Sequence, residues 1–96
     1  MPRKRTGSGK KGPPAPRPAA GRKTRRLAGA LRKAREDVGL SQEALALEAG
    51  VGRSGLSHFE LGKVEIRTAT LFRLIDVLHK ADRSITLATI ADSAGV

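Results

Sequence analysis

The chain has 96 residues, enough for one domain, and it contains no cysteine, which excludes disulfides and thiolate metal sites. Its formal net charge is +10, and two phenylalanines are its only aromatic residues, so the hydrophobic core has to be small and aliphatic. No apolar run reaches membrane-spanning length, and the basic start is not followed by the apolar region of a signal peptide.

The positive charge is concentrated at the start of the chain. Residues 1–26 hold ten of the nineteen Lys/Arg and none of the nine Asp/Glu, and all five prolines lie within the first 18 residues. We therefore expect residues 1–24 to be a disordered basic arm, because such a segment buries too little apolar surface to become ordered. Either the arm follows DNA phosphates or enters a minor groove, or it is a solubilising tail with non-specific affinity.

Apolar residues at helical spacing predict the next two elements. The first helix is expected over residues 25–38 and is ended by Gly39. The second is expected over residues 42–49, after Ser41, whose side-chain oxygen is a good N-cap. Gly50 ends it, because a turn with positive φ costs least at glycine.

Two further helices are predicted after this turn. The third covers residues 53–61 and buries Leu56 and Phe59. Thr68 is the expected N-cap of a fourth helix over residues 69–79. The core stripe of this fourth helix consists of Leu71, Leu74, Ile75 and Leu78.

The second and third helices, joined by a glycine turn, describe a helix-turn-helix. The outer face of the third helix carries side chains of the kind that hydrogen-bond base edges. These side chains are Arg53, Ser54, Ser57 and His58.

This segment resembles the lambda repressor/Cro and Xre class of helix-turn-helix proteins over about residues 27–78. The residues that carry the resemblance are Gln42, Ala46, Gly50, Leu56 and the closing run Glu60-Leu61-Gly62-Lys63. The sequence departs from the pattern at Gly55, where a helix interior normally carries a side chain. Glycine there costs roughly 1 kcal/mol of helix propensity.

The expected DNA contacts centre on the start of the third helix. Arg53 suits guanine O6 and N7, although a phosphate contact is the alternative. Ser54 and Ser57 can contact bases or phosphates, His58 reaches either further along, and Gly55 lets the backbone approach the DNA closely.

Lys63, in the loop after the third helix, is expected to contact a phosphate because of its position. The resemblance implies that Gln42 touches another phosphate and braces the start of the recognition helix. It also links Arg35 and Glu60 as a structural ion pair between the first helix and the end of the third. The alternative for this pair is two separately solvated charges.

Two other motifs point elsewhere but only weakly. The run from Gly50 to Gly55 satisfies G-x-G-x-x-G, with Asp76 about twenty residues later, but it follows a helix and no βαβ unit is present. His58 and His79 lack the partners of a metal site or of a catalytic base, so both are expected at the surface.

The end of the chain has a different pattern. Residues 83–91 are rich in β-branched side chains that alternate at period two, which predicts a strand. A lone strand needs a partner, and a second copy of the chain could supply it, as in the similar HipB-like antitoxins of the Xre class. The alternative is a frayed or helical C-terminus. Residues 92–96 are expected to be disordered.

These features predict an all-α fold: a compact four- to five-helix lambda-repressor-like helix-turn-helix domain over residues 25–82, with a short C-terminal dimerising β-strand. The expected protein is a bacterial, cytoplasmic, nucleoid-associated transcriptional repressor, not an enzyme. It would bind double-stranded DNA as a homodimer on a near-palindromic operator, without cofactor, metal or membrane. One alternative is an antitoxin that neutralises a partner toxin and autoregulates its operon; another is a nucleoid binder dominated by its tail.

Overall fold

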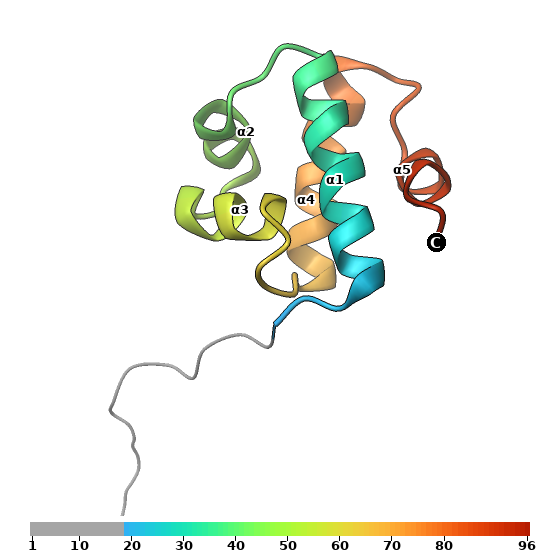
Figure 1. The fold of residues 1–96 in the computed structure, drawn as a ribbon. Helices are drawn as coiled ribbons and strands as arrows, with labels where there is room; N and C mark the ends of the chain where they lie inside the picture. The colour runs from blue at the N-terminus through green and yellow to red at the C-terminus, as the bar shows by residue number, and fades with distance from the viewer. Residues whose placement is uncertain (1–18) are drawn as a thin grey trace, which may run out of the picture.

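The computed structural model describes residues 19–96, so most of the predicted arm, residues 1–18, lies outside the described part. The described residues form five helices and no strand (Figure 1). The helices are α1 (Arg22–Asp37), α2 (Gln42–Ala49), α3 (Arg53–Glu60), α4 (Thr68–Ala81) and α5 (Leu87–Ala94). The all-α prediction is therefore confirmed. None of these helices is long and apolar enough to cross a membrane.

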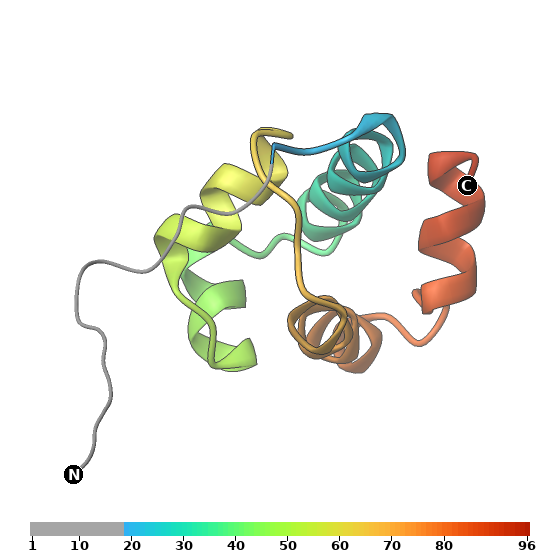
Figure 2. The same cartoon turned by 90° about the horizontal axis from the view of Figure 1, so that it is seen from below.

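Helix α1 runs through the middle of the molecule and packs against α3, α4 and α5. Figures 1 and 2 show α2 and α3 on one side of α1 and α5 on the other. The largest fully buried side chains come from α1 to α4, which share one aliphatic core around a single aromatic ring. They are Phe59, Leu31, Leu45, Leu74 and Leu78.

The first two helices follow the predicted signals closely. Helix α1 begins at Arg22, three residues earlier than expected, and ends before Gly39, whose φ is +80°. Helix α2 has the predicted bounds, and the Ser41 side chain accepts a hydrogen bond from the Ala44 backbone N–H at 3.0 Å. Gly50 ends α2 in the left-handed region, at φ 70° and ψ 34°.

The predicted bounds of the third and fourth helices differ slightly from the structure. Helix α3 ends at Glu60, one residue before the predicted end. Thr68 is the first residue of α4 rather than its cap: Arg67 occupies the N-cap position and makes no side-chain capping bond. The helix continues to Ala81, two residues beyond the predicted end.

The predicted C-terminal strand is wrong, since most of residues 83–91 belong to helix α5. Thr86 starts α5 with a capping box, in which its side chain and that of Thr89 bond each other's backbone N–H groups. Ile90 and Ala94, four residues apart, then face the core, and Gly95 ends the helix at φ 73°. Helix α5 therefore also includes part of residues 92–96, where disorder was expected. The prediction that this segment dimerises as a β-strand is therefore also wrong.

Candidate nucleic-acid interface

Helices α2 and α3 are joined by a turn of three residues that closes tightly. The Gly50 N–H donates to the Leu47 carbonyl at 3.2 Å, and the Val51 N–H donates to the Ala46 carbonyl at 2.9 Å. Val51 is half-buried and packs against the core, which anchors this turn. The turn sets α3 across the end of α2 and leaves one face of α3 in solvent.

The exposed face of α3 carries the predicted polar side chains. Arg53, Ser54 and His58 are exposed and Ser57 is half-buried. Within residues 19–96 none of these four side chains forms a hydrogen bond or an ion pair. Because residues four apart on a helix are neighbours, they make two adjacent rows, Arg53 with Ser57 and Ser54 with His58. The face is therefore free to bond an external partner.

The backbone at the start of α3 is also accessible. Gly52 is the N-cap and provides no side-chain capping bond. The first N–H groups of a helix have no partner within it, and they favour an anion. Gly55 lies in the same turn, and an added Cβ there would meet nothing within 4 Å. The first turn of α3 thus exposes both backbone donors and polar side chains.

The other end of α3 is locked into the domain. Arg35 donates from Nε to Glu60 Oε2 at 2.8 Å and from Nη2 to Oε1 at 2.9 Å, and the two side chains are only 10% and 1% exposed. A third donor of Arg35, Nη1, bonds the Leu40 carbonyl at 2.8 Å. The hydrogen bond to Glu60 raises the pKa of Arg35 above its ordinary value.

Gln42 joins the same cluster, which the sequence did not reveal. Its side-chain Nε2 donates to Glu60 Oε1 at 2.9 Å. This bond links the first turn of α2 to the last turn of α3, so Gln42 braces the end of the recognition helix rather than its start. We call Arg35, Gln42 and Glu60 the rear cluster. Lys63 follows it in the loop, with an exposed side chain.

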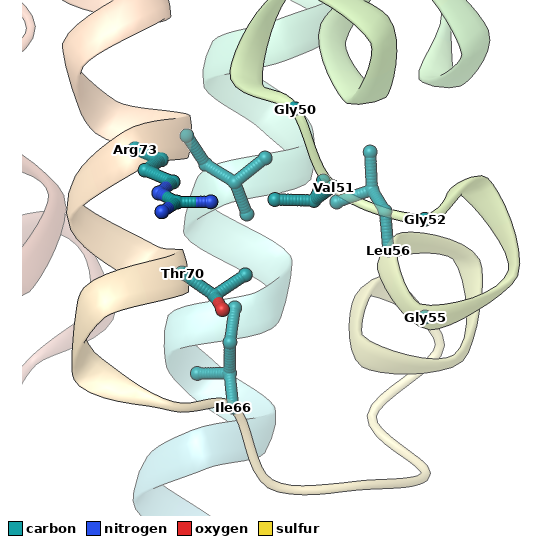
Figure 3. A pocket seen from close by; sticks show the side chains of 9 residues that line it. Gly50, Val51, Gly52, Gly55, Leu56, Ile66, Thr70 and Arg73 are labelled. Carbon is teal, nitrogen blue, oxygen red and sulfur yellow. The ribbon is translucent and has the colours of Figure 1, made fainter.

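A hollow of about 160 Å³ lies behind the first turn of α3 (Figure 3). Its walls come from the α2–α3 turn, from Leu56 and Ile66, and from Thr70 and Arg73 of α4. Cofactor pockets usually enclose roughly 300–1,000 Å³, so this hollow is too small for a dinucleotide. The G-x-G-x-x-G run passes from the end of α2 into α3, which is not the strand-to-helix turn that binds a pyrophosphate.

The two histidines have separate surroundings. His58 is exposed on α3, whereas His79 is half-buried, with Nδ1 2.9 Å from the Ile85 carbonyl oxygen. Because a carbonyl only accepts, Nδ1 carries the proton in this contact. Among residues 19–96 no three His, Cys, Asp or Glu side chains are grouped closely enough to hold a metal ion.

Residues 31–85 match the helix-turn-helix family HTH_3. Two crystal structures of the clp gene regulator ClgR from Corynebacterium glutamicum have a similar fold. One is 27% identical, covers 85% of this chain and 95% of that chain, and has a TM-score of 0.67. The other is 26% identical, covers 83% and 77%, and has a TM-score of 0.68. No curated protein sequence matches the chain. The chain belongs to the HTH_3 helix-turn-helix family and is a DNA-binding transcriptional regulator.

Proposed function

We propose that the protein is a sequence-specific repressor that binds a near-palindromic operator as a homodimer, with α3 in the major groove. The observation that carries this proposal is the asymmetry of α3. Its outer face presents polar side chains without partners among the described residues, and its other end is fixed by buried charged groups. A rigidly held helix with an unpaired polar face suits base recognition.

Each exposed residue has a proposed role on the DNA. Arg53 bonds guanine O6 and N7, Ser54 and Ser57 bond bases or phosphates, and His58 contacts a base edge or phosphate further along the groove. The bare backbone at Gly55 lets α3 approach the duplex closely. Gln42 and Lys63, both near the last turn of α3, contact phosphates, and the family resemblance favours this role for Gln42.

A hollow between α4 and α5 supports the homodimer. It is lined by Phe72, Ile75, His79 and Leu87, among others, and has a volume of about 290 Å³. Phe72 is 50% exposed and Leu87 43%, so two large apolar side chains face solvent together at this hollow. This surface lies on a different face of α4 from the hollow behind α3. A second copy seated here would leave both recognition helices free to enter major grooves about 34–36 Å apart.

The DNA proposal is tested by fluorescence anisotropy at physiological salt. We compare a duplex from just upstream of the protein's own gene with a scrambled duplex of equal length. The wild type should prefer the upstream duplex about 10³-fold or more. Arg53→Ala should lose roughly 5- to 150-fold of this preference for each half-site, because a bidentate contact to guanine contributes about 1–3 kcal/mol. The thermal unfolding midpoint should not change, since the Arg53 side chain is exposed.

Two results would contradict the proposal. If both duplexes bind alike and Arg53→Ala changes neither affinity, binding is not sequence-specific through α3. That outcome favours the nucleoid-binder alternative, in which the basic arm dominates. A reporter driven by the upstream DNA separates repression from activation: occlusion of the promoter lowers its expression, and an increase would rule out repression there.

The dimer proposal is tested by sedimentation. Phe72→Glu and Leu87→Glu should shift the protein toward monomer, because each places a charge in the proposed apolar contact. Leu47→Glu is the matched control: Leu47 is 80% exposed on α2 and does not line the hollow between α4 and α5. A wild type that stays monomeric on its specific duplex would overturn the homodimer.

The antitoxin alternative has lost its main structural support, because the terminal strand it invoked is helix α5. It still makes a distinct prediction: co-expression with a toxin encoded beside this gene would rescue growth. For the repressor we propose a cytoplasmic location at the nucleoid, since its partner is chromosomal DNA.

A further inference from the structure

Helix α1 begins without a capping side chain of its own. Its N-cap is Gly21, and its first turn contains no acid. Glu65, from the loop between α3 and α4, supplies the missing group. The Gly21 N–H donates to Glu65 Oε2 at 2.8 Å, and the Thr24 hydroxyl donates to Oε1 at 2.5 Å. The carboxylate therefore lies against the positive end of the helix dipole.

The residues just before α1 follow the same loop. Ala19 forms an isolated antiparallel bridge with Val64, and the Ala20 N–H donates to the Lys63 carbonyl at 3.4 Å. Ala20 is buried, and its carbonyl accepts a hydrogen bond from Arg25 Nη1 at 2.9 Å. The chain is thus held from Ala19 into the first turn of α1. We call Gly21, Thr24 and Glu65 the arm clamp.

The clamp fixes where the basic arm joins the domain. Figures 1 and 2 show the start of α1 beside the loop that follows α3. Lys63 lies in this loop, three residues after the end of α3. The 18 residues that precede Ala19 can span at most about 60–65 Å in any conformation, and that span starts beside the loop that follows α3. They contain Arg3, Lys4, Arg5, Lys10, Lys11 and Arg17.

We propose that Glu65 is a positioning residue for the arm: it ties the base of the arm beside Lys63, so that the six cations bind phosphates of the duplex that α3 occupies. This inference rests on the proposed DNA-binding face. An acidic side chain so near a DNA surface would by itself repel phosphates. Its hydrogen bonds to Thr24 and Gly21 lower the pKa of Glu65, which therefore stays ionised and bonded at neutral pH.

The test is a double-mutant cycle on the full chain. One change replaces the six arm cations by Gln, and the other is Glu65→Gln with Thr24→Val, which weakens the clamp with nearly isosteric side chains. Affinity for the upstream duplex is measured against salt for the wild type, both variants and their combination. Glu48→Gln, on the exposed surface of α2, controls for the lost negative charge.

Neutralising the arm should lower wild-type affinity about tenfold or more, with a salt slope reduced by up to about five for each arm of the dimer. In the clamp variant, the factor by which the same neutralisation lowers DNA affinity should be at least about threefold smaller than in the wild type. In the Glu48→Gln variant this factor should equal that of the wild type. Equal costs with and without the clamp would overturn the proposal and make Glu65 a cap of α1 only. So would an arm whose neutralisation has no effect in either background.

A second readout reports position rather than stability. The chain has no cysteine, so Ser8→Cys creates a single attachment point for a hydroxyl-radical cleavage reagent. With the clamp intact, cleavage should be confined to a few nucleotides beside the half-site, and it should spread in the clamp variant. An unchanged pattern would overturn the proposal. Arg53→Ala in the wild-type background separately decides whether α3 reads sequence, so the two proposals can fail independently.

Discussion

The two ends of α3 are built in opposite ways. At its last turn, Glu60 is buried and bonded to both Arg35 and Gln42. At its first turn, Gly52 gives no cap, Gly55 gives no side chain, and a hollow lies behind the backbone. Strong, desolvated bonds therefore fix the direction of the helix, while the donors of the end that is proposed to face DNA have no partner among the described residues. Within the eight residues of α3, the buried contacts that stabilise the helix lie at its last turn, and the groups proposed to bind DNA centre on its first turn.

The start of α1 sharpens this contrast. Gly21 and Gly52 are both glycine N-caps without side-chain bonds of their own. The first is completed by Glu65, and the second is left bare among the described residues. Two helix starts of the same local sequence type thus differ because one has a structural partner in the chain and the other faces outward.

The largest effect is expected at the rear cluster. Arg35→Met leaves the buried Glu60 carboxylate with Gln42 as its remaining bonded side chain, so the free energy of unfolding should fall by about 3–5 kcal/mol. Arg32→Met is the matched control. Its ion pair with Glu36 is 53% exposed on both sides, and such pairs contribute about 0–1 kcal/mol. Urea denaturation measures both.

The double variant Arg35→Met with Glu60→Leu makes the test stricter. Replacing both members of a buried pair by apolar groups is often neutral or stabilising, so this protein should recover most of the lost stability. If Arg35→Met costs no more than Arg32→Met, the last turn of α3 is not held by these charges, and the contrast between its two ends disappears.

A smaller effect is expected at two glycines inside helices. Gly29 of α1 and Gly55 of α3 each have open space where a Cβ would lie. Alanine at either position should raise the free energy of unfolding by about 0.5–1 kcal/mol, because glycine loses more backbone freedom on folding. Thermal unfolding should show midpoints raised by a few degrees in both variants, consistent with about 4–8 °C per kcal/mol.

DNA affinity should then separate these two variants. Gly29→Ala lies away from the proposed DNA face and should bind the upstream duplex like the wild type. Gly55→Ala places a methyl group where the α3 backbone is proposed to approach DNA, so its specific affinity should fall although the protein is more stable. Equal affinities would show that the bare first turn of α3 does not serve close approach.

The helix-turn-helix could be predicted because its signals are local. Ser41 caps the start of α2, Gly50 ends α2 with a positive φ, and Leu56 places the buried face of α3. Each signal acts within its own helix or turn, so it can be read from a few neighbouring residues. Helix α5 could not, because a short run of Ile, Leu and Thr fits a strand and a helix equally well. Its capping box uses Thr89 rather than Glu or Gln, so the usual sequence signature is missing.

The site residues divide in the same manner. The exposed face of α3 followed from helical spacing, since Leu56 and Phe59 had to face the core. The bond from Gln42 to Glu60 spans 18 positions, and that from Gly21 to Glu65 spans 44. Such contacts depend on how the helices pack, which local patterns do not encode. The pairing of Arg35 with Glu60 was suggested only by the family resemblance.

The smallest effect is expected at the start of α1, and it should depend on pH. Hydrogen bonds from Thr24 and Gly21 lower the pKa of Glu65 below its ordinary value of 4.5. A carboxyl group with a lowered pKa in the folded state contributes stability above its unfolded pKa. That contribution is lost as the pH falls through the lower, folded value. Glu65→Gln should therefore reduce the unfolding midpoint at neutral pH, and the difference from the wild type should vanish in acid.

Unfolding midpoints from neutral pH into acid measure this difference, with Glu48→Gln as the control that should follow the wild type throughout. Restoring wild-type stability at neutral pH by any neutral side chain at position 65 would contradict the capping role. A constant difference at all pH values would show that the shape of Glu65 matters and its charge does not. In either case the starts of α1 and α3 would no longer differ in this respect, because neither helix would depend on an anionic cap.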